Sequence, residues 1–374
     1  MTTESSESRA AFNELLTTLG EVADQYAGDE WGIAGAEDTA GALRAVAHLL
    51  EGGLLGHFED DPTTPVFRPI VSSTRKSLGD NADAIYFDTA VSNAYEYLVT
   101  GNTAGAIYTS FTLEEGGGDG GYPDRTGGII NDTQFDVDAT GDFAIRLGGP
   151  AQDRNWMPLT DATTRITSRH YWEELWRPGA EPVRDVQLAV QVIGASEPPP
   201  PPSDASVAAG LRRVANYVAS RTVGMGPPGS RVQPGFVSTE PNVFPPPVTP
   251  SDHPLAAIDA AYSMAPYVLG PDDALVMRAR WPECRCANVM LWNRYLQTYD
   301  YVHRSVSLNR AQTQLDADGW FTVVISNRNP GVANWIDTEG KWFGLVFWRF
   351  MLPEGRIETP QASVVPIDSL RPAP

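Results

Sequence analysis

The sequence predicts a mainly β protein made of two jelly-roll-like β-sandwiches related by internal duplication, with helices at the N-terminus and in the middle of the chain. Three observations support this prediction. Short β-branched and aromatic runs separated by Gly, Asn, Asp and Pro fill most of the chain after residue 61, a spacing typical of sandwiches and barrels. Three other segments carry apolar residues at helical spacing. One pattern of residues occurs twice.

The composition excludes several classes of partner. The 374 residues include 47 acidic and 27 basic ones, and the net charge of −20 repels nucleic acids and anionic membrane surfaces. The N-terminus lacks the basic and then apolar stretch of a secretory signal, and no run approaches the roughly 20 apolar residues of a membrane-spanning helix. We therefore expect a soluble, cytoplasmic protein without nucleic-acid or membrane partners, and the sequence leaves a homo-oligomer open.

Residues 1–60 predict an N-terminal helical cap. Apolar side chains recur every three or four residues over 8–27 and again over 37–51, which is the stripe of an amphipathic helix. Such a stripe usually packs on the protein's own core, so we expect both helices to lie against the β-rich body.

Residues 61–196 predict the first sandwich. Strand-like runs occur over 106–113, 143–147 and 165–172. Between two such runs, Gly116–Gly121 has the sequence GGGDGG. A phosphate-binding loop needs a strand before it and a helix after it. The Tyr-Pro-Asp that follows starts a helix poorly, so we interpret this segment as a flexible hairpin loop.

Residues 197–270 predict a proline-rich linker that contains a helix. Five consecutive prolines after Glu197 exclude a helix interior and a central strand. We expect a helix from Asp204 to about Arg221, because Ser203 or Asp204 suits the N-cap position and apolar residues follow at helical spacing.

A second proline-rich stretch, 227–254, lies at the end of this linker. It is compatible with a mobile lid and with an ordered segment wrapped over the surface, and the sequence does not choose between them. The second sandwich is expected over 271–374.

The internal repeat is a polar turn, a strand, a polar loop and an Asn-Trp pair. The distance between the two copies is constant to within two residues along the pattern, which favours duplication over coincidence. We interpret the Asn as a turn residue that tolerates the left-handed conformation and the Trp as a plug at the end of the sheet, both with a scaffold role. The copies are Gln134–Asp138, Phe143–Leu147 and Asn155-Trp156, and Gln314–Asp318, Phe321–Ile325 and Asn334-Trp335.

Several longer strings resemble a known family. They are GAIYTSFTLEEG, NDTQFDVDATGDF, NWMPL, LWNRYLQTYDYVHRSVSLNR and FTVVISNRNPGVANWIDTEG. In these strings the chain resembles the bacterial domain-of-unknown-function family 1214, which often accompanies family 1254. The resemblance covers about residues 80–175 and 280–352. It implies a β-sandwich of jelly-roll type, and it implies neither an activity nor catalytic residues.

Arginine and aromatic residues concentrate between residues 277 and 337. In so acidic a chain, two interpretations of these arginines are open: they form a local positive site for a carboxylate, sulfate or phosphate, or they pair with neighbouring carboxylates. On a strand, Arg278 and Arg280 share one face and can reach one anion, while Met277 and Ala279 face the other way. The candidate ligand-binding residues are Arg278, Arg280, Trp292, Arg294, Tyr299 and Tyr301.

Asp300 and His303 are the candidate catalytic residues. They form a general acid–base pair if the segment turns, whereas on a strand they face opposite sides. Cys284, Cys286 and His303 are three potential metal ligands, but a fourth is not evident, so we predict no metal and no cofactor. The two cysteines are also poorly spaced for a strain-free disulfide.

The expected function is a small-molecule enzyme or pocket protein that acts on an anionic or glycosidic organic compound, with its pocket in the second sandwich. The alternative is a non-catalytic carbohydrate-binding or assembly protein whose jelly-roll surfaces make the contacts. The chain has no nucleophile elbow, Walker loop or dinucleotide fingerprint. Whether the protein is an enzyme stays open from sequence.

Overall fold

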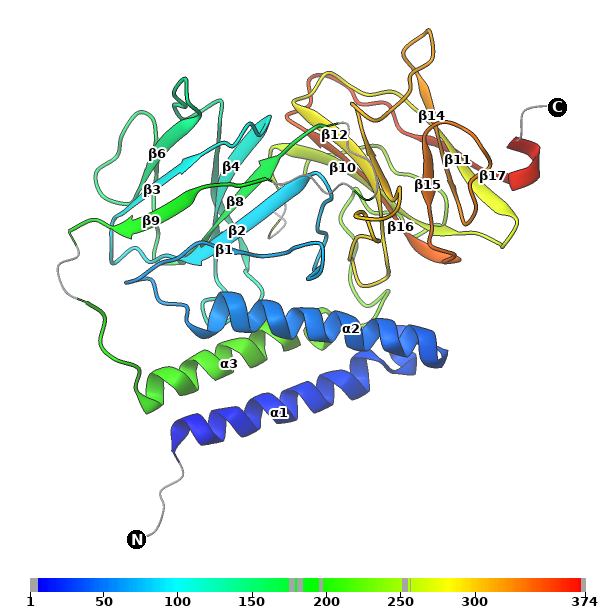
Figure 1. Ribbon diagram of the computed structural model, residues 1–374. Helices are drawn as coiled ribbons and strands as arrows, with labels where there is room; N and C mark the ends of the chain where they lie inside the picture. Colours follow the sequence, from blue (N-terminus) through cyan, green and yellow to red (C-terminus); the bar gives the residue numbers. More distant parts are fainter. Residues whose placement is uncertain are drawn as a thin grey trace.

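The structure is a computed structural model that describes residues 6–174, 179, 184–194, 198–250, 255 and 257–370. Within these residues the chain forms three α-helices and four β-sheets (Figure 1). The prediction of a mainly β protein with N-terminal and mid-chain helices is therefore confirmed. No helix in the described parts of the chain is long and apolar enough to cross a membrane.

The three helices lie together beneath the sheets in the view of Figure 1. They are α1 (Glu7–Tyr26), α2 (Gly35–Gly53) and α3 (Asp204–Ser220). As the sequence predicts, Ser203 caps α3, with its hydroxyl accepting from the backbone N–H of Ser206. The apolar stripes of the helices pack on one another. Shorter helical turns are Asp29–Trp31, Leu54–Phe58, Val223–Met225 and Ile367–Leu370.

The first half of the body consists of two sheets that share a core. Phe111 and Ile166 of one sheet pack in one cluster with Val99 and Ile145 of the other. The first sheet has the order β1 (Arg68–Pro69), β2 (Ala84–Ala90), β8 (Thr163–Tyr171), β4 (Tyr108–Glu115) and β5 (Arg125–Asn131). The second sheet has the order β7 (Trp156–Met157), β6 (Asp142–Leu147), β3 (Tyr97–Asn102) and β9 (Leu188–Val192).

The second half also consists of two sheets around a core, which contains Phe321 and Trp348. Its first strand begins at Ala260, within the stretch for which the sequence predicts a linker. One sheet has the order β10 (Ala260–Val268), β16 (Phe343–Met351), β12 (Cys286–Trp292) and β13 (Ser307–Asn309). The other has the order β15 (Trp335–Asp337), β14 (Phe321–Ser326), β11 (Asp273–Ala279) and β17 (Gln361–Pro366).

The two halves meet through the sheet that contains β8 and the sheet that contains β16. A further core cluster takes Tyr86 and Tyr171 from the first sheet and Tyr262 and Phe347 from the second, and these sheets lie side by side in the middle of Figure 1. Each central sheet is therefore covered on one face by its own half and on the other by the opposite half. This arrangement buries polar residues such as Arg169 that would otherwise face water.

Two aspartates hold the halves together. Asp83 of the first half accepts a hydrogen bond from Asn309 of the second at 2.9 Å. Asp259 of the second half accepts one from Asn131 of the first, also at 2.9 Å. The contact between the halves is thus polar at its ends and aromatic in its centre, which fixes their relative position.

The described part of the second proline-rich stretch runs along β10. The Met264 amide donates to the Phe236 carbonyl at 2.7 Å, and the Tyr262 amide donates to the Val248 carbonyl at 3.0 Å. This part is an ordered wrap, because both contacts use backbone groups of a buried strand. Residues 251–254 lie outside the described residues.

Candidate functional site

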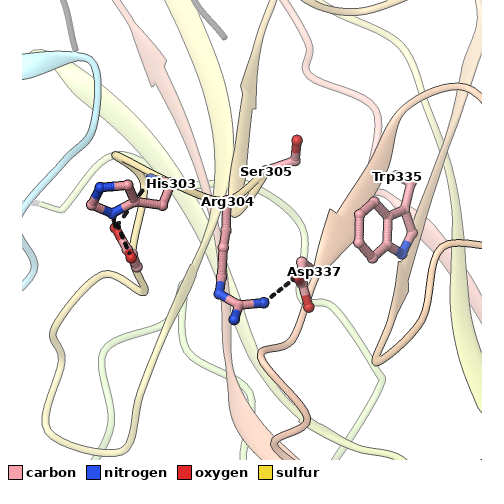
Figure 2. A pocket seen from close by; sticks show the side chains of 6 residues that line it. His303, Arg304, Ser305, Trp335 and Asp337 are labelled. Carbon is pink, nitrogen blue, oxygen red and sulfur yellow. Dashed lines mark hydrogen bonds and ion pairs between the residues drawn. The ribbon is translucent and has the colours of Figure 1, made fainter. Parts of the chain in front are cut away.

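The candidate catalytic pair, Asp300 and His303, is brought together by a turn. His303 Nδ1 lies 2.9 Å from the Asp300 carboxylate, and both residues line a shallow hollow beside Trp335 (Figure 2). In the same hollow Arg304 forms an ion pair with Asp337 at 2.9 Å. The His303 side chain is 71% exposed. Partial burial raises the pKa of Asp300, but the hydrogen bonds from His303 outweigh it and hold this pKa below its usual range. Water screens the pair, because the His303 side chain is mostly exposed.

Arg278 and Arg280 do not line this hollow. Arg278 lies on β11, and Arg280 follows directly after its last residue, Ala279. Met277 and Ala279 are buried, whereas Arg278 is half-buried and Arg280 exposed, so the predicted alternation is confirmed over 277–279. Arg278 pairs with Asp316, and its other amino group is 3.5 Å from Asp318. The alternative reading from sequence, in which these arginines pair with carboxylates, describes Arg278.

The aromatic candidates are parts of the framework. Trp292 is buried, stacks on Phe347 with ring centroids 4.2 Å apart, and donates to the Asp80 carbonyl at 2.9 Å. Tyr299 is buried with its hydroxyl 2.7 Å from that of Tyr267.

The remaining two candidates contact other segments. Arg294 donates to the Gly32 carbonyl at 2.5 Å. Tyr301 lies under the Lys76 ammonium, 4.5 Å from the ring centroid. The structure therefore does not gather the predicted ligand-binding residues into one pocket.

A different pocket lies where the two halves meet, and we name it the arginine–tyrosine pocket. The central sheets supply Tyr86, Tyr171 and Tyr262 to its walls, α3 supplies Tyr217, and the Gly116–Gly121 loop borders it. Its volume is about 130 Å³, close to that of engineered cavities of about 150 Å³ that bind benzene. The pocket therefore has the size for a small organic molecule. Its charged lining residues are Asp80, Asp88, Glu114, Arg165, Arg169, Arg221 and Arg349.

Arg349, on β16, is the most unusual of these residues. It is 6% exposed, and its Nε and Nη1 donate to no acceptor in the described part of the chain. Aromatic rings surround its guanidinium carbon, which is 4.9 Å from the Phe347 centroid and 5.8 Å from those of Tyr171 and Tyr262. Ring faces attract a cation but do not replace hydrogen-bond acceptors.

Arg165 and Arg169 have partners of their own. Arg165 forms ion pairs with Asp60 and Asp88, the latter at 2.9 Å. Arg169 donates to the Leu255 carbonyl at 3.0 Å, and its Nη2 stands 3.7 Å from the Glu114 carboxylate.

Arg221 is also supported, although by neutral groups. It donates to the Gly120 carbonyl at 3.1 Å and to the Ser220 hydroxyl at 3.0 Å, and it covers the Tyr217 ring at 3.8 Å. Among the four pocket arginines, Arg349 is thus the one for which the described residues supply neither a carboxylate nor a carbonyl.

The lining of the pocket carries an excess of one positive charge. Four arginines face the three carboxylates of Asp80, Asp88 and Glu114. Two charged groups lie just outside the pocket: Asp60, which pairs with Arg165, and Lys76, whose charge acts on Asp80. Their opposite charges leave the sum unchanged. A protein of net charge −20 therefore keeps a positive pocket, and a monoanion would neutralise it.

The tyrosines of the pocket are hydrogen-bond donors. The hydroxyls of Tyr86 and Tyr171 are 3.1 Å apart. Burial raises the pKa of both, although Arg349 opposes it, and burial raises the pKa of Tyr262 to about 12. All three phenols therefore keep their protons at neutral pH. The Tyr262 hydroxyl donates to the Ala257 carbonyl at 3.4 Å, and one of Tyr86 and Tyr171 donates to the other, so one phenolic O–H and the Arg349 guanidinium are left for an anion.

Sequence reasoning missed Arg169 and Arg349, but a signal for them exists. The register of the sheets places Arg169 opposite Tyr86 and Arg349 opposite Tyr262. Both tyrosines end an Asp-Ala-X-Tyr string, at 83–86 and 259–262. These repeated strings, together with arginines in otherwise apolar strands, are the sequence signal for the pocket.

Comparisons with known proteins identify the fold. Neither a family model nor a curated protein matches the chain. The crystal structure of an uncharacterised protein from Burkholderia cenocepacia superposes with a TM-score of 0.82 at 24% sequence identity, covering 96% of this chain and 98% of that one. The two proteins share one fold. A protein from Vibrio parahaemolyticus aligns over 86% of this chain and 100% of its own at 12% identity, with a TM-score of 0.46.

In the described ranges, no three or more His, Cys, Asp or Glu side chains are arranged to hold a metal ion. Cys284 and Cys286 are free thiols, and burial raises the pKa of Cys284 to about 11. Neither thiol is therefore activated as a nucleophile at neutral pH.

Proposed function

We propose that this protein binds a small organic anion in the arginine–tyrosine pocket, with Arg349 as the anchor. The observation that carries this proposal is the buried guanidinium of Arg349, for which the described residues supply no acceptor. Removing an arginine from water without a partner costs several kcal/mol. A carboxylate bound to this guanidinium would supply charge-assisted hydrogen bonds and offset that cost.

The pocket lies at the junction of the halves rather than within residues 271–374 alone. Arg349 and Tyr262 come from the second half, whereas Tyr86, Tyr171 and Glu114 come from the first. The proposal thus still has an anion bound by arginine, as the sequence suggests, but the arginine is Arg349 and not Arg278 or Arg280. An interface between two packed units is a common position for a ligand pocket.

Binding of benzoate to an Arg349 variant tests this proposal. Isothermal titration should show benzoate binding to the unaltered protein and at least a tenfold weaker affinity for Arg349→Gln, because a charge-assisted contact contributes about 1.5–3 kcal/mol. The matched control is Arg278→Gln, which alters an arginine paired with Asp316 at the surface. Equal loss in both variants, or no loss in Arg349→Gln, would overturn the assignment.

We also propose that the two halves are jelly-roll-like sandwiches related by duplication, in agreement with the resemblance to family 1214. In support, the order β2-β8-β4-β5 has the same succession as β10-β16-β12-β13, and β7-β6-β3-β9 the same as β15-β14-β11-β17. Each half also has one short parallel pair, in which Arg146 is aligned with Trp156 and Val324 with Trp335.

The Asn-Trp pairs support the same proposal. Asn155 and Asn334 have left-handed φ values of 56° and 54°. The side-chain oxygen of Asn155 accepts from the Asp136 amide at 2.8 Å, and that of Asn334 accepts from the Gln314 amide at 2.7 Å. Both asparagines therefore hold a left-handed turn and clasp the segment before the neighbouring strand, as expected of scaffold residues.

A further inference from the structure

A second pocket lies beside the arginine–tyrosine pocket and shares Val71 and Asp80 with it. Residues between 69 and 85 form most of its lining, together with Arg184 and Tyr301, and we name it the Asn81–Arg184 pocket. Its volume is about 290 Å³, roughly twice that of engineered cavities that hold one benzene. The pocket therefore has space for a single ring that carries several substituents.

Asn81 supplies a buried donor without an acceptor. Its side chain is 3% exposed, and its side-chain oxygen accepts from the Asp83 amide and from Nδ2 of Asn288, both at 2.9 Å. These two donors fix which end of the carboxamide is the oxygen, so the nitrogen faces away from them. Among the described residues this Nδ2 donates to no acceptor. A buried donor in this state is costly, which indicates that a bound molecule supplies the acceptor.

Arg184 supplies a second donor of the same kind. Its side chain is 7% exposed and pairs with Glu174 through Nη2 at 3.2 Å, while the guanidinium covers the Trp172 ring at 4.6 Å. Its Nε has no acceptor within the described ranges. Nη1 stands 3.5 Å from the Ala82 carbonyl oxygen. Because Ala82 directly follows Asn81 and all three residues line the pocket, both unpartnered donors belong to one wall.

The charges around this pocket are balanced. Its charged lining residues are Asp80 and Arg184, which carry opposite charges. Just outside, Lys76 acts on Asp80 and Glu174 pairs with Arg184, and these two charges also cancel. An anion would bring an uncompensated charge into a largely buried site. The acceptor that Asn81 and Arg184 require is therefore an oxygen of a neutral ligand.

The lining combines hydrogen-bond acceptors with apolar surface. Ser72, Ser73 and Asp80 offer oxygens, and the two oxygens of Asp80 each accept one hydrogen bond, both from Thr298, so each keeps a lone pair. Val71 and Ile85 provide apolar contacts in the same lining. A hydroxyl is the neutral group that both accepts and donates, and a ring bearing hydroxyls also has apolar C–H faces.

We infer that the Asn81–Arg184 pocket binds the ring of a neutral sugar, with hydroxyl oxygens that accept from Asn81 Nδ2 and Arg184 Nε. The inference is independent of the anion proposed for the neighbouring pocket. Ligand-observed NMR titrations with D-glucose, D-galactose and D-mannose test it, and at least one should bind saturably. The uronate of the preferred sugar, which carries a carboxylate at C6, should bind more weakly. Binding by none of the three sugars, or tighter binding of the uronate, would overturn the inference.

Arg184→Lys tests the wall that holds both donors. Lysine keeps the positive charge beside Glu174 but lacks the Nε–H, so the affinity for the preferred sugar should fall about tenfold, as expected for a hydrogen bond from a charged group. The matched control is Arg154→Lys, which alters an exposed arginine paired with Asp136 at 2.9 Å, and its affinity should not change. An unchanged affinity in Arg184→Lys, or the same loss in the control, would contradict the assignment.

Asn81→Asp and a competition experiment complete the test. The aspartate keeps an oxygen for the Asp83 amide and replaces the donor by an acceptor, so this variant should also bind the sugar at least about tenfold more weakly. Thermal unfolding checks that it is folded, and Arg184→Lys decides if it is not. Benzoate should leave the sugar bound, because the arginine–tyrosine pocket is a separate site. Displacement of the sugar by benzoate, or full sugar affinity in folded Asn81→Asp, would overturn the inference.

Discussion

Arg169 and Arg349 occupy matching positions in the two central sheets but differ in their partners. Each is aligned with a tyrosine on the neighbouring strand, Tyr86 for Arg169 and Tyr262 for Arg349. Arg169 has the Glu114 carboxylate within 3.7 Å and donates to the Leu255 carbonyl, whereas Arg349 has neither kind of partner among the described residues. Arg169 thus belongs to a structural ion pair in its sheet, whereas the guanidinium of Arg349 has no such partner among the described residues.

Arg349→Met should stabilise the ligand-free protein by about 1–3 kcal/mol while it removes anion binding. The substitution replaces a buried charge that has no partner by an apolar side chain of similar length. Urea denaturation without ligand measures the change. A loss of stability would mean that Arg349 has a partner within the protein and is not held open for a ligand.

Arg169→Met should have the opposite effect. It leaves the buried Glu114 carboxylate without its cation, and breaking such a pair costs about 3–5 kcal/mol. The same urea experiment compares the two variants directly. A smaller cost for Arg169→Met than for Arg349→Met would contradict the distinction between them.

The stability of the protein should fall on acidification in a way that depends on His170. This side chain is buried on β8 between Phe87 and Phe111, and burial lowers its pKa to about 3. A histidine with a depressed folded pKa stabilises the protein fully above the unfolded pKa of about 6.5 and loses that contribution as the pH falls toward 3.

His170→Gln should therefore be less sensitive to pH between 6.5 and 4.5, as measured by urea denaturation at several pH values. The buried carboxylates Asp80 and Glu114 do not cause the same fall. Burial raises the pKa of each, so their contribution to stability is present at low pH and is lost as the pH rises. An identical pH profile for His170→Gln and the unaltered protein would show that another group controls acid stability.

The left-handed turns at Asn155 and Asn334 should tolerate glycine better than alanine. At Asn155, alanine loses the hydrogen bond to the Asp136 amide and also strains a φ of 56°, so we expect a loss of about 2–3 kcal/mol. Glycine relieves the strain and should cost about 1 kcal/mol. Chemical denaturation of both variants at each site checks this. Equal costs for alanine and glycine would show that the turn conformation is not the constraint.

The fold was predictable where one short segment contains its own signal. The stripes at 8–27 and 37–51 predict α1 and α2, and Ser203 predicts the start of α3. The Asn-Trp pairs mark corresponding turns because their conformation is local: a left-handed residue followed by an aromatic one at a strand end.

The pocket was not predictable in the same way. Arg349 lies in a strand that is apolar on both faces, and this pattern predicts burial correctly but says nothing of a partner for the guanidinium. That depends on β8, β10 and α3, which lie far from it in sequence. The number of arginines in 277–337 predicts an anion site there. Arg278 pairs instead with Asp316, which lies in a turn between strands, and composition alone does not show this contact.

The position of a bound acid tests the central claim most directly. A crystal structure with 4-bromobenzoate, whose bromine can be located by its anomalous scattering, should place the carboxylate against the guanidinium of Arg349 and the ring between the tyrosines of the pocket. A carboxylate bound instead at Arg278 and Arg280, or beside Asp300 and His303, would contradict this account and restore the site that the arginine-rich segment predicts.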